Sequence, residues 1–550
     1  MKQKNEKLII LITCFLLVFA IYGRTLAGNF VFDDRGIIEH QYLLSDFSKI
    51  PNVLSLPYWT KEAGLYRPIT LFSYTLNFLF LGNGALGFHL INIILYALTG
   101  YLIFLFIRRI FKQDFLAVLT AVLFIILPIH SEAVANIIGR AEILALFFSL
   151  LALSALISDE NGKNKMRFAG VWFFLAMGSK ETAIAVLPVA LAVAWINNKF
   201  IINVEDEKTK ISVFERGIGF CRQYWSGFLS LAIGLLAYFL ARYLVLGRQY
   251  FLGVETSIVE NPLKFVPFWP RIFTAFKITG IYFSKIFWPL DLCSDYSYNQ
   301  IPISDSFWQA GVLAGFFIII GLFFAIFYFW RRRAEISFGV LFFILSFILV
   351  SNFIFPIGAI AGERLVYFAS LGICLILASV FACVLKSKVK EIFKIAAFAF
   401  LLLIIIFYSV VSFKRAGDWQ TEKKLFASAA RCAPNSVLSR SNLGAAYYLE
   451  KDYKNAEKEL LAAEKIYDSY PKGVNNLGLV FWKKGEREKA REYFLRALSF
   501  RFPYYGAYEN LALMALEDGN MEEAKKWLKE FYLGNEDAAE KYIKSYQGVR

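Results

Sequence analysis

Long apolar runs alternate with short polar or basic loops over the first three quarters of the chain. About 20 consecutive apolar residues are enough for a helix to cross a bilayer. Beyond about residue 415 the pattern changes, and Lys, Glu, Ala and Asn dominate. We therefore predict an all-α protein with two parts, a helical membrane bundle in residues 1–414 and a soluble extracytoplasmic domain in residues 415–550. Hydropathy predicts about eleven spans, near residues 8–22, 86–107, 115–129, 141–157, 168–179, 182–196, 226–246, 307–330, 336–355, 365–385 and 394–413.

Basic residues gather at the ends of several predicted spans and indicate their direction. Lysines precede the first run, and three consecutive arginines, residues 331–333, follow the run near 307–330. Because cytoplasmic loops are enriched in Lys and Arg, we place the N-terminus in the cytoplasm and the C-terminal part outside the cell membrane. No small-residue cleavage site is obvious after the first run, so we interpret it as a retained span and not as a signal peptide.

The stretch between residues 247 and 306 fits this topology only if it stays outside. Its apolar part, 271–290, would then be re-entrant or lie in the membrane interface, which irregular segments do where protein covers them. The alternative is an additional span with an inverted C-terminal part. We prefer the first interpretation because the triple-arginine signal after residue 330 is strong.

The C-terminal part contains an internal repeat. Similar segments begin at Ser441, Asn475 and Glu509, each 34 residues after the one before. A helix–turn–helix unit of this length, with small residues where its helices touch, is typical of tetratricopeptide repeats. We predict repeats near 437–470, 471–504 and 505–538, stacked into a curved solenoid with a concave face. Such an array is either a spacer or a surface that binds a partner, and the pattern leaves both open.

Composition narrows the class of protein further. The chain is 58% hydrophobic and 19% charged, which excludes an ordinary soluble protein. Its net charge of +15 comes from loop Lys and Arg, and no basic stripe with interleaved aromatic residues indicates nucleic-acid binding. With three His and no HExxH motif, no zinc site is predicted. Cys293 and Cys432 would both lie outside and could pair.

Ionisable residues within or beside apolar spans are the candidate functional residues, because such groups are costly near lipid. Asp33 and Asp34 follow a Phe-Val-Phe triplet in GNFVFDDRGI, and taken alone this pair is equally consistent with a helix cap and with a functional site. The other candidates are Arg67, Glu132, Arg140, Lys180, Glu181, Glu363, Arg364 and Tyr367. All of the candidates map to the outer side of the membrane, which favours one shared polar site over unrelated ion pairs between helices.

Glycosyl transfer from a lipid-phosphate sugar would use such a site. The phosphate departs without protonation, so one carboxylate is enough to take the proton from the acceptor hydroxyl. Arginines beside the departing phosphate would complete the site, because their planar donor groups match its oxygens. The lipid tail would lie between the helices in the bilayer, which explains a site at the outer surface.

The chain resembles the transmembrane and tetratricopeptide-repeat-containing O-mannosyltransferases, in the GT-C glycosyltransferase superfamily. The resemblance rests on FVFDDRGII, YRPITLFSYTLNF, GFHLINIILYAL, PIHSEAVANIIGRAEILA, SKET, DYSYNQIP, FPIGAIAGERLVYFASLG and DWQTEKKLFASAARCAPNS, in that order and followed by the repeats. It implies a GT-C bundle that transfers mannose from a polyprenyl-phosphate carrier to Ser or Thr of proteins, with inversion. It also implies that one residue of the acidic pair is the catalytic base. We assign this role to Asp33 and expect Asp34 to support the acceptor or the fold. Assigning Arg140 and Arg364 to the phosphate is our own inference.

Three repeats are fewer than eukaryotic relatives usually carry, so we expect a bacterial member in the inner membrane that uses undecaprenyl phosphate. For a bacterial member, the sequence does not determine which sugar is transferred. It also does not determine the acceptor, because a hydroxyl of a glycan or a lipid could accept the sugar in place of a protein hydroxyl. No cofactor is predicted, and although the acidic pair could hold a divalent metal ion, two carboxylates are too few to argue for one. Other classes of function are a membrane-anchored repeat scaffold without enzymatic activity and a flippase, which would need polar residues through the midplane of the bilayer.

Overall fold

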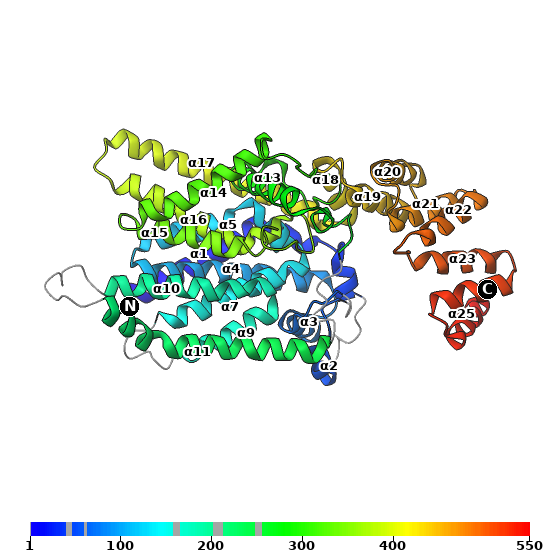
Figure 1. Cartoon of the computed structure of the whole chain (residues 1–550), viewed down its shortest axis with the longest axis horizontal. Coiled ribbons are helices and arrows are strands. Elements are labelled where there is room, and N and C mark those ends of the chain that lie inside the picture. The colour runs from blue at the N-terminus through cyan, green and yellow to red at the C-terminus, as the bar shows by residue number, and fades with distance from the viewer. Residues whose placement is uncertain are drawn as a thin grey trace. The chain divides into compact units, whose positions relative to one another are not determined.

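The computed structural model describes residues 2–39, 47–59, 63–157, 166–201, 213–247 and 256–549. These residues form helices joined by loops and include no β-strand, which confirms the predicted all-α class (Figure 1). The chain divides into two compact units. The first comprises Met1–Ser257, Asn261–Ser294 and Ile303–Thr421, and the second Ile258–Glu260, Asp295–Pro302 and Glu422–Arg550.

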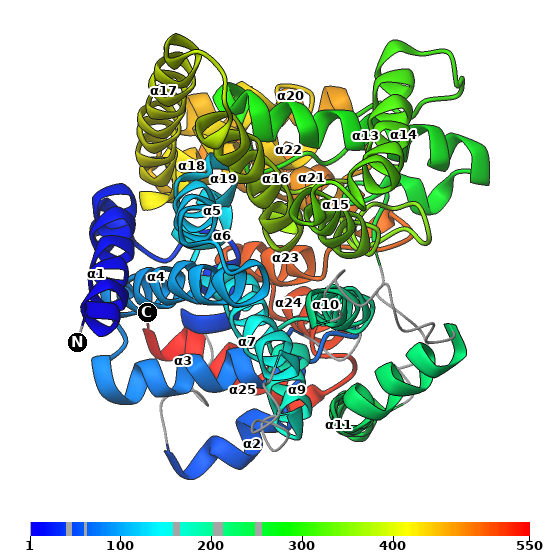
Figure 2. The same ribbon diagram turned by 90° about the vertical axis from the view of Figure 1, so that its left-hand side faces the viewer.

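The first unit is a bundle of long apolar helices (Figure 2). They are α1 (Lys2–Tyr22), α3 (Pro68–Leu81), α4 (Ala85–Phe111), α5 (Asp114–Ile126), α7 (Arg140–Leu156), α9 (Ala169–Ser179), α10 (Val186–Ile201), α11 (Val213–Leu246), α13 (Phe268–Phe287), α14 (Ala310–Phe329), α15 (Ala334–Phe347), α16 (Tyr367–Lys386) and α17 (Glu391–Ala416). Short helical turns join them: η1 (Gly23–Ala27), η2 (Arg35–Glu39), η4 (Phe47–Lys49), α2 (Ile50–Leu54), η5 (Pro128–His130), α6 (Ser131–Ala135), η6 (Ile137–Gly139), η8 (Glu181–Ala185), η9 (Pro262–Phe265), η10 (Pro289–Asp291), η11 (Glu363–Val366) and η12 (Gly417–Gln420).

The predicted number of eleven spans is not confirmed. Among the described residues, seven helices are long and apolar enough to cross a membrane, or eight if the bent pair Asp114–Ile126 and Pro128–Ala135 forms one span. The expected spans 168–179, 182–196 and 336–355 coincide with helices shorter than a full crossing. The expected interfacial stretch 271–290 is α13, which is not one of the seven. Between the expected spans 182–196 and 226–246, residues 202–212 lie outside the described residues.

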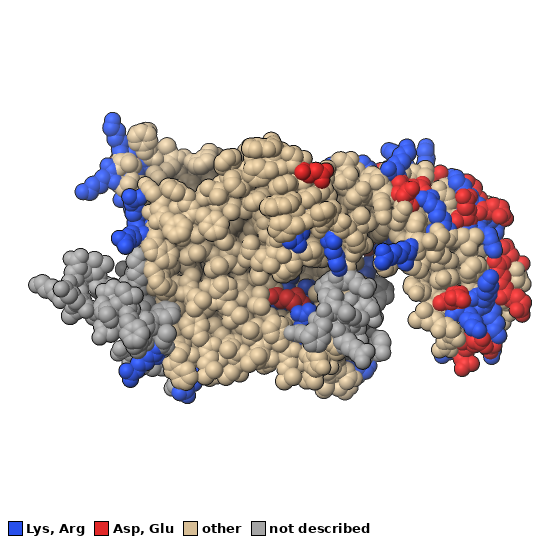
Figure 3. Space-filling model, viewed as in Figure 1, with Lys and Arg blue, Asp and Glu red and all other residues tan. Residues whose placement is uncertain are grey.

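Exposure supports a bundle surrounded by lipid. Leu236 on α11, Phe327 on α14 and Leu403 on α17 are each more than 60% exposed, whereas α4 and α7 are largely buried. The space-filling view shows a broad surface without charges over this unit, with Lys and Arg at one edge (Figure 3). The N-terminus and the loops α14–α15 and α16–α17 lie at that same end, and α3 lies toward the other (Figure 1).

Glycines allow two helix pairs to pack closely. A Cβ atom on Gly372 of α16 would overlap the carbonyl oxygen of Gly339 on α15, and one on Gly234 of α11 would overlap that of Gly170 on α9. Association of helices in a membrane depends on such close packing, because lipid offers no hydrophobic driving force between them.

The second unit is built mainly of helix pairs. Its helices are α18 (Glu422–Cys432), α19 (Val437–Leu449), α20 (Tyr453–Ile466), α21 (Pro471–Lys483), α22 (Arg487–Ser499), α23 (Gly506–Glu517), α24 (Met521–Phe531) and α25 (Glu536–Val549). Ala456, Ala490 and Ala524 are fully buried at equivalent positions of α20, α22 and α24. Asp452 and Asn520 cap α20 and α24 by accepting hydrogen bonds from backbone N–H groups. The C-terminal stretch of this unit runs from Glu422 to Arg550.

A short stretch that precedes α14 in the chain also belongs to the second unit. Asp295 accepts hydrogen bonds from the hydroxyls of Ser297 at 3.0 Å, Ser439 at 2.7 Å and Ser436. The backbone N–H of Val437 donates to the carbonyl of Tyr298 at 2.7 Å. Cys293 and Cys432 are both disulfide-bonded. Cys14, Cys374 and Cys383 are free thiols.

Candidate functional site

The two adjacent aspartates lie in different environments. Phe32 has a φ of 54°, a left-handed conformation that is unusual for a bulky residue and turns the chain just before the pair. Asp34 is fully buried, and its two oxygens accept hydrogen bonds from the backbone N–H groups of Val31 at 3.1 Å and Ile138 at 3.0 Å. Asp34 therefore fastens the loop after α1 to η6.

Burial also changes the protonation of Asp34. It raises the pKa of this carboxyl to about 7, although hydrogen bonds from the two backbone N–H groups oppose the shift. Asp33, by contrast, is only partly buried. Its negative charge acts on Arg364, which lies about 330 positions further along the chain. Two neighbouring carboxyls in different environments commonly take different roles.

Arg364 is held by Glu132. The backbone N–H of Arg364 donates to one oxygen of Glu132 at 2.9 Å, and its Nη1 donates to the other at 3.1 Å. Glu132 is 2% exposed, whereas the side chain of Arg364 is 32% exposed. Glu132 thus anchors both the start of η11 and one side of the guanidinium. The other donors of Arg364 have no protein partner among the described residues, so they are available to a ligand.

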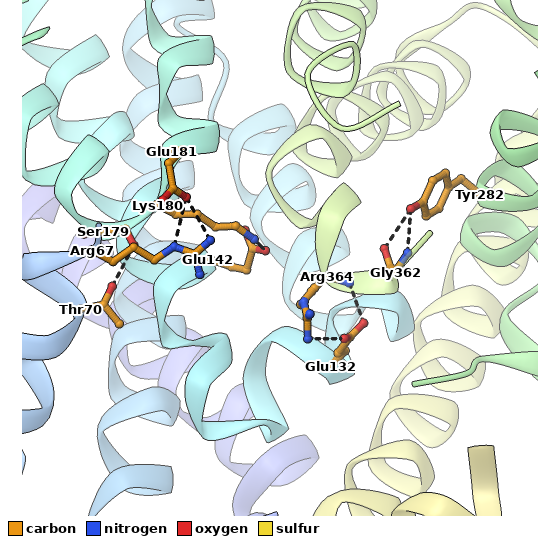
Figure 4. A network of polar contacts seen from close by, with 10 residues as sticks. All are labelled: Arg67, Thr70, Glu132, Glu142, Ser179, Lys180, Glu181, Tyr282, Gly362 and Arg364. Atoms are coloured by element: carbon orange, nitrogen blue, oxygen red, sulfur yellow. Dashed lines mark hydrogen bonds and ion pairs between the residues drawn. The ribbon is translucent and has the colours of Figure 1, made fainter. Parts of the chain in front are cut away.

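Two further ion pairs lie beside this one (Figure 4). Lys180, at the end of α9, is paired with Glu142 in the first turn of α7. Arg67, just before α3, contacts Glu181 through Nε at 3.1 Å and Nη2 at 3.0 Å, and stacks over the ring of Tyr58 at 4.7 Å. All four ionised side chains are mostly buried, and a buried charge requires such a partner.

The charges of these pairs act on one another. Burial lowers the pKa of Lys180, and Glu142 only partly restores it, because the positive charges of Arg67 and Arg364 also act on this ammonium group. For Arg67, burial opposes the charged form, but Glu181 and Tyr58 raise its pKa above the usual value. The structure therefore brings Arg67, Glu132, Lys180, Glu181 and Arg364 into one network with Asp33, although the sequence separates them widely.

Arg140 lies outside this network. It is fully buried, with its guanidinium stacked over Tyr74 at 4.9 Å and Phe88 at 5.5 Å. Its donors reach Asn92 at 2.7 Å and Asn77 at 3.0 Å, as well as the backbone carbonyls of Ser73 and Phe88. Because protein groups take all three of its nitrogens, Arg140 joins α3, α4 and α7 and does not reach a ligand.

Glu363 and Tyr367 also face the interior. Glu363 is fully buried and accepts a hydrogen bond from the backbone N–H of Cys293. Tyr367 is fully buried among aromatic rings, with His130 at 4.8 Å and Phe124 at 5.3 Å between centroids. These residues shape the first turns of α16, next to Arg364. Of the predicted candidates, Asp33 and Arg364 are thus partly accessible, whereas Glu132, Glu363 and Tyr367 are buried beside Arg364.

Three other residues complete the site. Glu142, which lies in the same polar stretch as Glu132 and Arg140, is the partner of Lys180. Tyr58 lies under Arg67. Tyr282 on α13 accepts from the N–H of Gly362 at 2.9 Å and donates to its carbonyl at 3.1 Å, which holds the loop before Arg364 (Figure 4). No motif distinguishes these tyrosines among the 29 of the chain.

No group of three or more His, Cys, Asp or Glu side chains in the described part of the chain has the geometry to hold a metal ion. The carboxylates of the network are instead paired with Lys or Arg.

Known proteins resemble both parts of the chain. Residues 67–208 match the family of dolichyl-phosphate-mannose-protein mannosyltransferases, a stretch that contains Arg67, Glu132, Lys180 and Glu181. Residues 472–502 match the tetratricopeptide repeat, which confirms the predicted repeat type.

The relatives with curated descriptions extend this similarity. A protein O-mannosyl-transferase of Caenorhabditis elegans is 28% identical over 85% of this chain and 64% of its own length. Human protein O-mannosyl-transferase TMTC3 is 26% identical over 82% of this chain and 50% of its own length. The chain is similar to these O-mannosyl-transferases over most of its length. It spans between about half and two thirds of the length of these relatives.

Among solved structures, the archaeal oligosaccharyltransferase AglB from Archaeoglobus fulgidus, in complex with an inhibitory peptide and a dolichol-phosphate, is 14% identical. The alignment covers 75% of this chain and 56% of the archaeal chain, with a TM-score of 0.41. A score this low does not establish a shared fold.

Proposed function

We propose that this protein is a membrane glycosyltransferase of the GT-C type. It moves mannose from a polyprenyl-phosphate carrier to a hydroxyl of a protein Ser or Thr. The observation that carries the proposal is the network around Arg364, where an accessible guanidinium lies within electrostatic range of Asp33. The relationship to protein O-mannosyl-transferases supports the sugar and the type of acceptor.

Asp33 acts as the base. Its carboxylate takes the proton from the acceptor hydroxyl as the hydroxyl oxygen attacks the anomeric carbon. The bond from that carbon to the phosphate oxygen breaks, and the phosphate leaves with the electron pair, so the anomeric centre is inverted. Asp34 does not serve as the base, because its oxygens are taken by two backbone N–H groups.

Arg364 binds the phosphate of the donor. Its exposed donors would contact two phosphate oxygens and stabilise the charge that develops as the phosphate departs. Glu132 fixes the orientation of the guanidinium, so little rotational freedom is lost when the donor binds. Arg67 and Lys180 lie beside this pair, and Glu181 and Glu142 neutralise their buried charges.

The site faces the extracytoplasmic side. It lies at the end of the bundle opposite the N-terminus and the basic loops, which the distribution of Lys and Arg assigns to the cytoplasm. The repeats then lie outside the cytoplasm, where their concave face binds acceptor proteins. In this proposal the protein spans the inner membrane several times.

The test uses the full chain reconstituted in nanodiscs with radiolabelled polyprenyl-phosphate mannose and an extract of extracytoplasmic proteins. Transfer of label to protein supports the proposal, and loss of transfer in Asp33→Asn assigns the base. Absence of transfer by the unaltered chain, while an acceptor protein still binds to the repeats, would favour a scaffold without enzymatic activity.

A further inference from the structure

A cavity of about 100 Å³ lies at the end of the bundle that carries the basic loops. It is bordered by the start of α5, the start of α15 and the end of α16. Arg333, Lys386 and Gln113 contribute donors, Glu335 contributes one carboxylate, and Leu116 and Ala382 form an apolar part of the wall.

This cavity is separate from the site described above. The two sites border opposite ends of α16, since Arg364 precedes its first residue and Lys386 is its last. A helix of 20 residues is about 30 Å long, which is the thickness of the hydrocarbon core of a bilayer. The cavity therefore lies at the opposite membrane face, where the headgroups of the other leaflet are found.

The donors of the cavity are accessible. Arg333 and Lys386 are exposed, and the amide of Gln113 and the ammonium of Lys386 have no partner among the described residues. Arg333 contacts Glu335 at 3.8 Å and Cys383 Sγ at 3.2 Å, which holds its guanidinium at the rim. With two cations and one carboxylate, the lining has a net charge of +1.

The size and chemistry of the cavity restrict its ligand. Drug-sized molecules require pockets of roughly 300 Å³ or more, so a cavity of about 100 Å³ accommodates a small group only. An arginine fork together with a lysine and an amide matches a phosphate group. The apolar wall beside these donors suits the first carbons of an acyl glycerol.

We propose that this cavity binds the phosphate headgroup of an anionic phospholipid from the leaflet opposite the candidate active site. The lipid would contact both the loop α14–α15 and the end of α16. It would therefore stabilise the α15–α16 pair at the membrane face opposite the candidate active site. A free phosphate ion offers the same chemistry, and the experiment distinguishes the two sources.

The experiment measures lipid retention by native mass spectrometry. The full chain is purified from nanodiscs of phosphatidylcholine that contain a minor fraction of phosphatidylglycerol. We compare Arg333→Ala/Lys386→Ala with Arg331→Ala/Lys388→Ala, a control that removes the same charge from neighbouring positions outside the cavity lining. Circular dichroism and thermal unfolding verify that both double variants are folded.

The cavity variant should lose retained phosphatidylglycerol by roughly 10- to 30-fold, since each basic residue near a headgroup contributes about a tenfold factor or less. The control should retain most of it, because neither of its residues lines the cavity. Inorganic phosphate is then added as a competitor. Displacement of the lipid assigns recognition to the phosphate group alone, whereas retention assigns it to the whole headgroup, and both results support the proposal. Equal loss in the two double variants, or no loss in either, overturns it.

Discussion

At the scale of single residues, two adjacent aspartates have different environments because of the backbone around them. The left-handed turn at Phe32 directs Asp34 to the N–H groups of Val31 and Ile138, and leaves Asp33 partly exposed. A carboxylate that accepts two backbone hydrogen bonds in the interior is a structural group. This difference between neighbours makes the pair open to direct test, because the same substitution should have different effects at each position.

Replacing Asp34 with Asn should destabilise the loop. One oxygen would become an amide N–H₂ that faces a backbone N–H donor, which costs about 1–3 kcal/mol. Hydrogen exchange of the amides of Val31 and Ile138 should become faster by the factor that corresponds to this loss of free energy. Unchanged protection of both amides in this variant would contradict the role of Asp34.

The stability of the unaltered loop should also depend on pH. Because the pKa of Asp34 is raised to about 7 in the folded chain, the folded state binds the proton more tightly than the unfolded state. The contribution of Asp34 is therefore fully present below about pH 4 and is lost as the pH rises through about 7. The protection of the same two amides, corrected for the intrinsic exchange rate, should fall across this window. It should become nearly independent of pH in Asp34→Asn, and persistent dependence would exclude Asp34 as the titrating group.

Arg364 offers a further test at this scale. In Arg364→Lys, a single ammonium group replaces the planar fork, so two phosphate oxygens are no longer contacted together. We expect transfer, measured as kcat/KM for the lipid-linked donor, to fall by roughly 10- to 100-fold with little change in thermal stability. The same substitution at Arg331, at the other end of the bundle, is the control. Equal rates for both variants would remove Arg364 from the proposed phosphate site.

At the scale of helices, the network joins segments that are far apart in sequence. Arg67 precedes α3, Glu132 lies in α6, Lys180 ends α9 and Arg364 lies in η11. Each is at a helix end or a short turn, where side chains leave the apolar interior of the bundle. Close packing of the long helices holds these ends in register, and the contact between Gly339 and Gly372 is one of the tightest.

Substituting Gly372 with Leu should separate α15 from α16. The new side chain would overlap the backbone of Gly339, and overpacking of this kind costs about 1–3 kcal/mol. Gly321→Leu on α14 is the matched control, because no atom of another helix lies within 4 Å of the position that its Cβ atom would occupy. The midpoint of thermal unfolding should fall for Gly372→Leu only, and equal midpoints would contradict the packing described.

Much of this arrangement could be predicted from sequence, for physical reasons. Hydropathy located the long helices because apolar length is a local property, and the 34-residue period located the repeats. The grouping of polar residues on one side followed from the order of the spans. The roles of Arg140 and Glu363 could not be predicted, because their partners, such as Asn92 and Cys293, come from distant segments. The eleven expected spans are not all matched by helices of crossing length among the described residues, because short helices such as α9 and α15 have the composition of a span without its length.

At the scale of the whole molecule, two units of different chemistry share one chain. The first is stabilised by apolar packing with few charges, and the second by an alanine-rich core and ion pairs between consecutive repeats, including Lys484–Glu457 at 2.8 Å and Arg487–Glu517 at 2.9 Å. The segment 295–302 contributes to the second unit although it precedes α14. The repeats should therefore depend on residues more than 100 positions before them.

Removing the Asp295 carboxylate should destabilise the first helix pair of the solenoid. In Asp295→Ala, the hydroxyls of Ser436 and Ser439 lose a charged acceptor, and a hydrogen bond to a charged group contributes about 1.5–3 kcal/mol. Hydrogen exchange in α19 should become faster, while exchange in α24 should not change. Asp537→Ala, in the first turn of α25, is the control. Unchanged exchange in α19 would show that the segment does not stabilise the repeats.

The proposed function depends most directly on the role of Asp33 as the base, which is distinct from the structural role of Asp34 in the same loop. The decisive measurement is mannose transfer by Asp33→Asn in nanodiscs, with the protection of the Val31 and Ile138 amides recorded on the same sample. We predict that transfer is lost while both amides remain protected, because Asn keeps the size of the side chain but does not accept the hydroxyl proton. Transfer at the rate of the unaltered chain would contradict the assignment of Asp33 as the base.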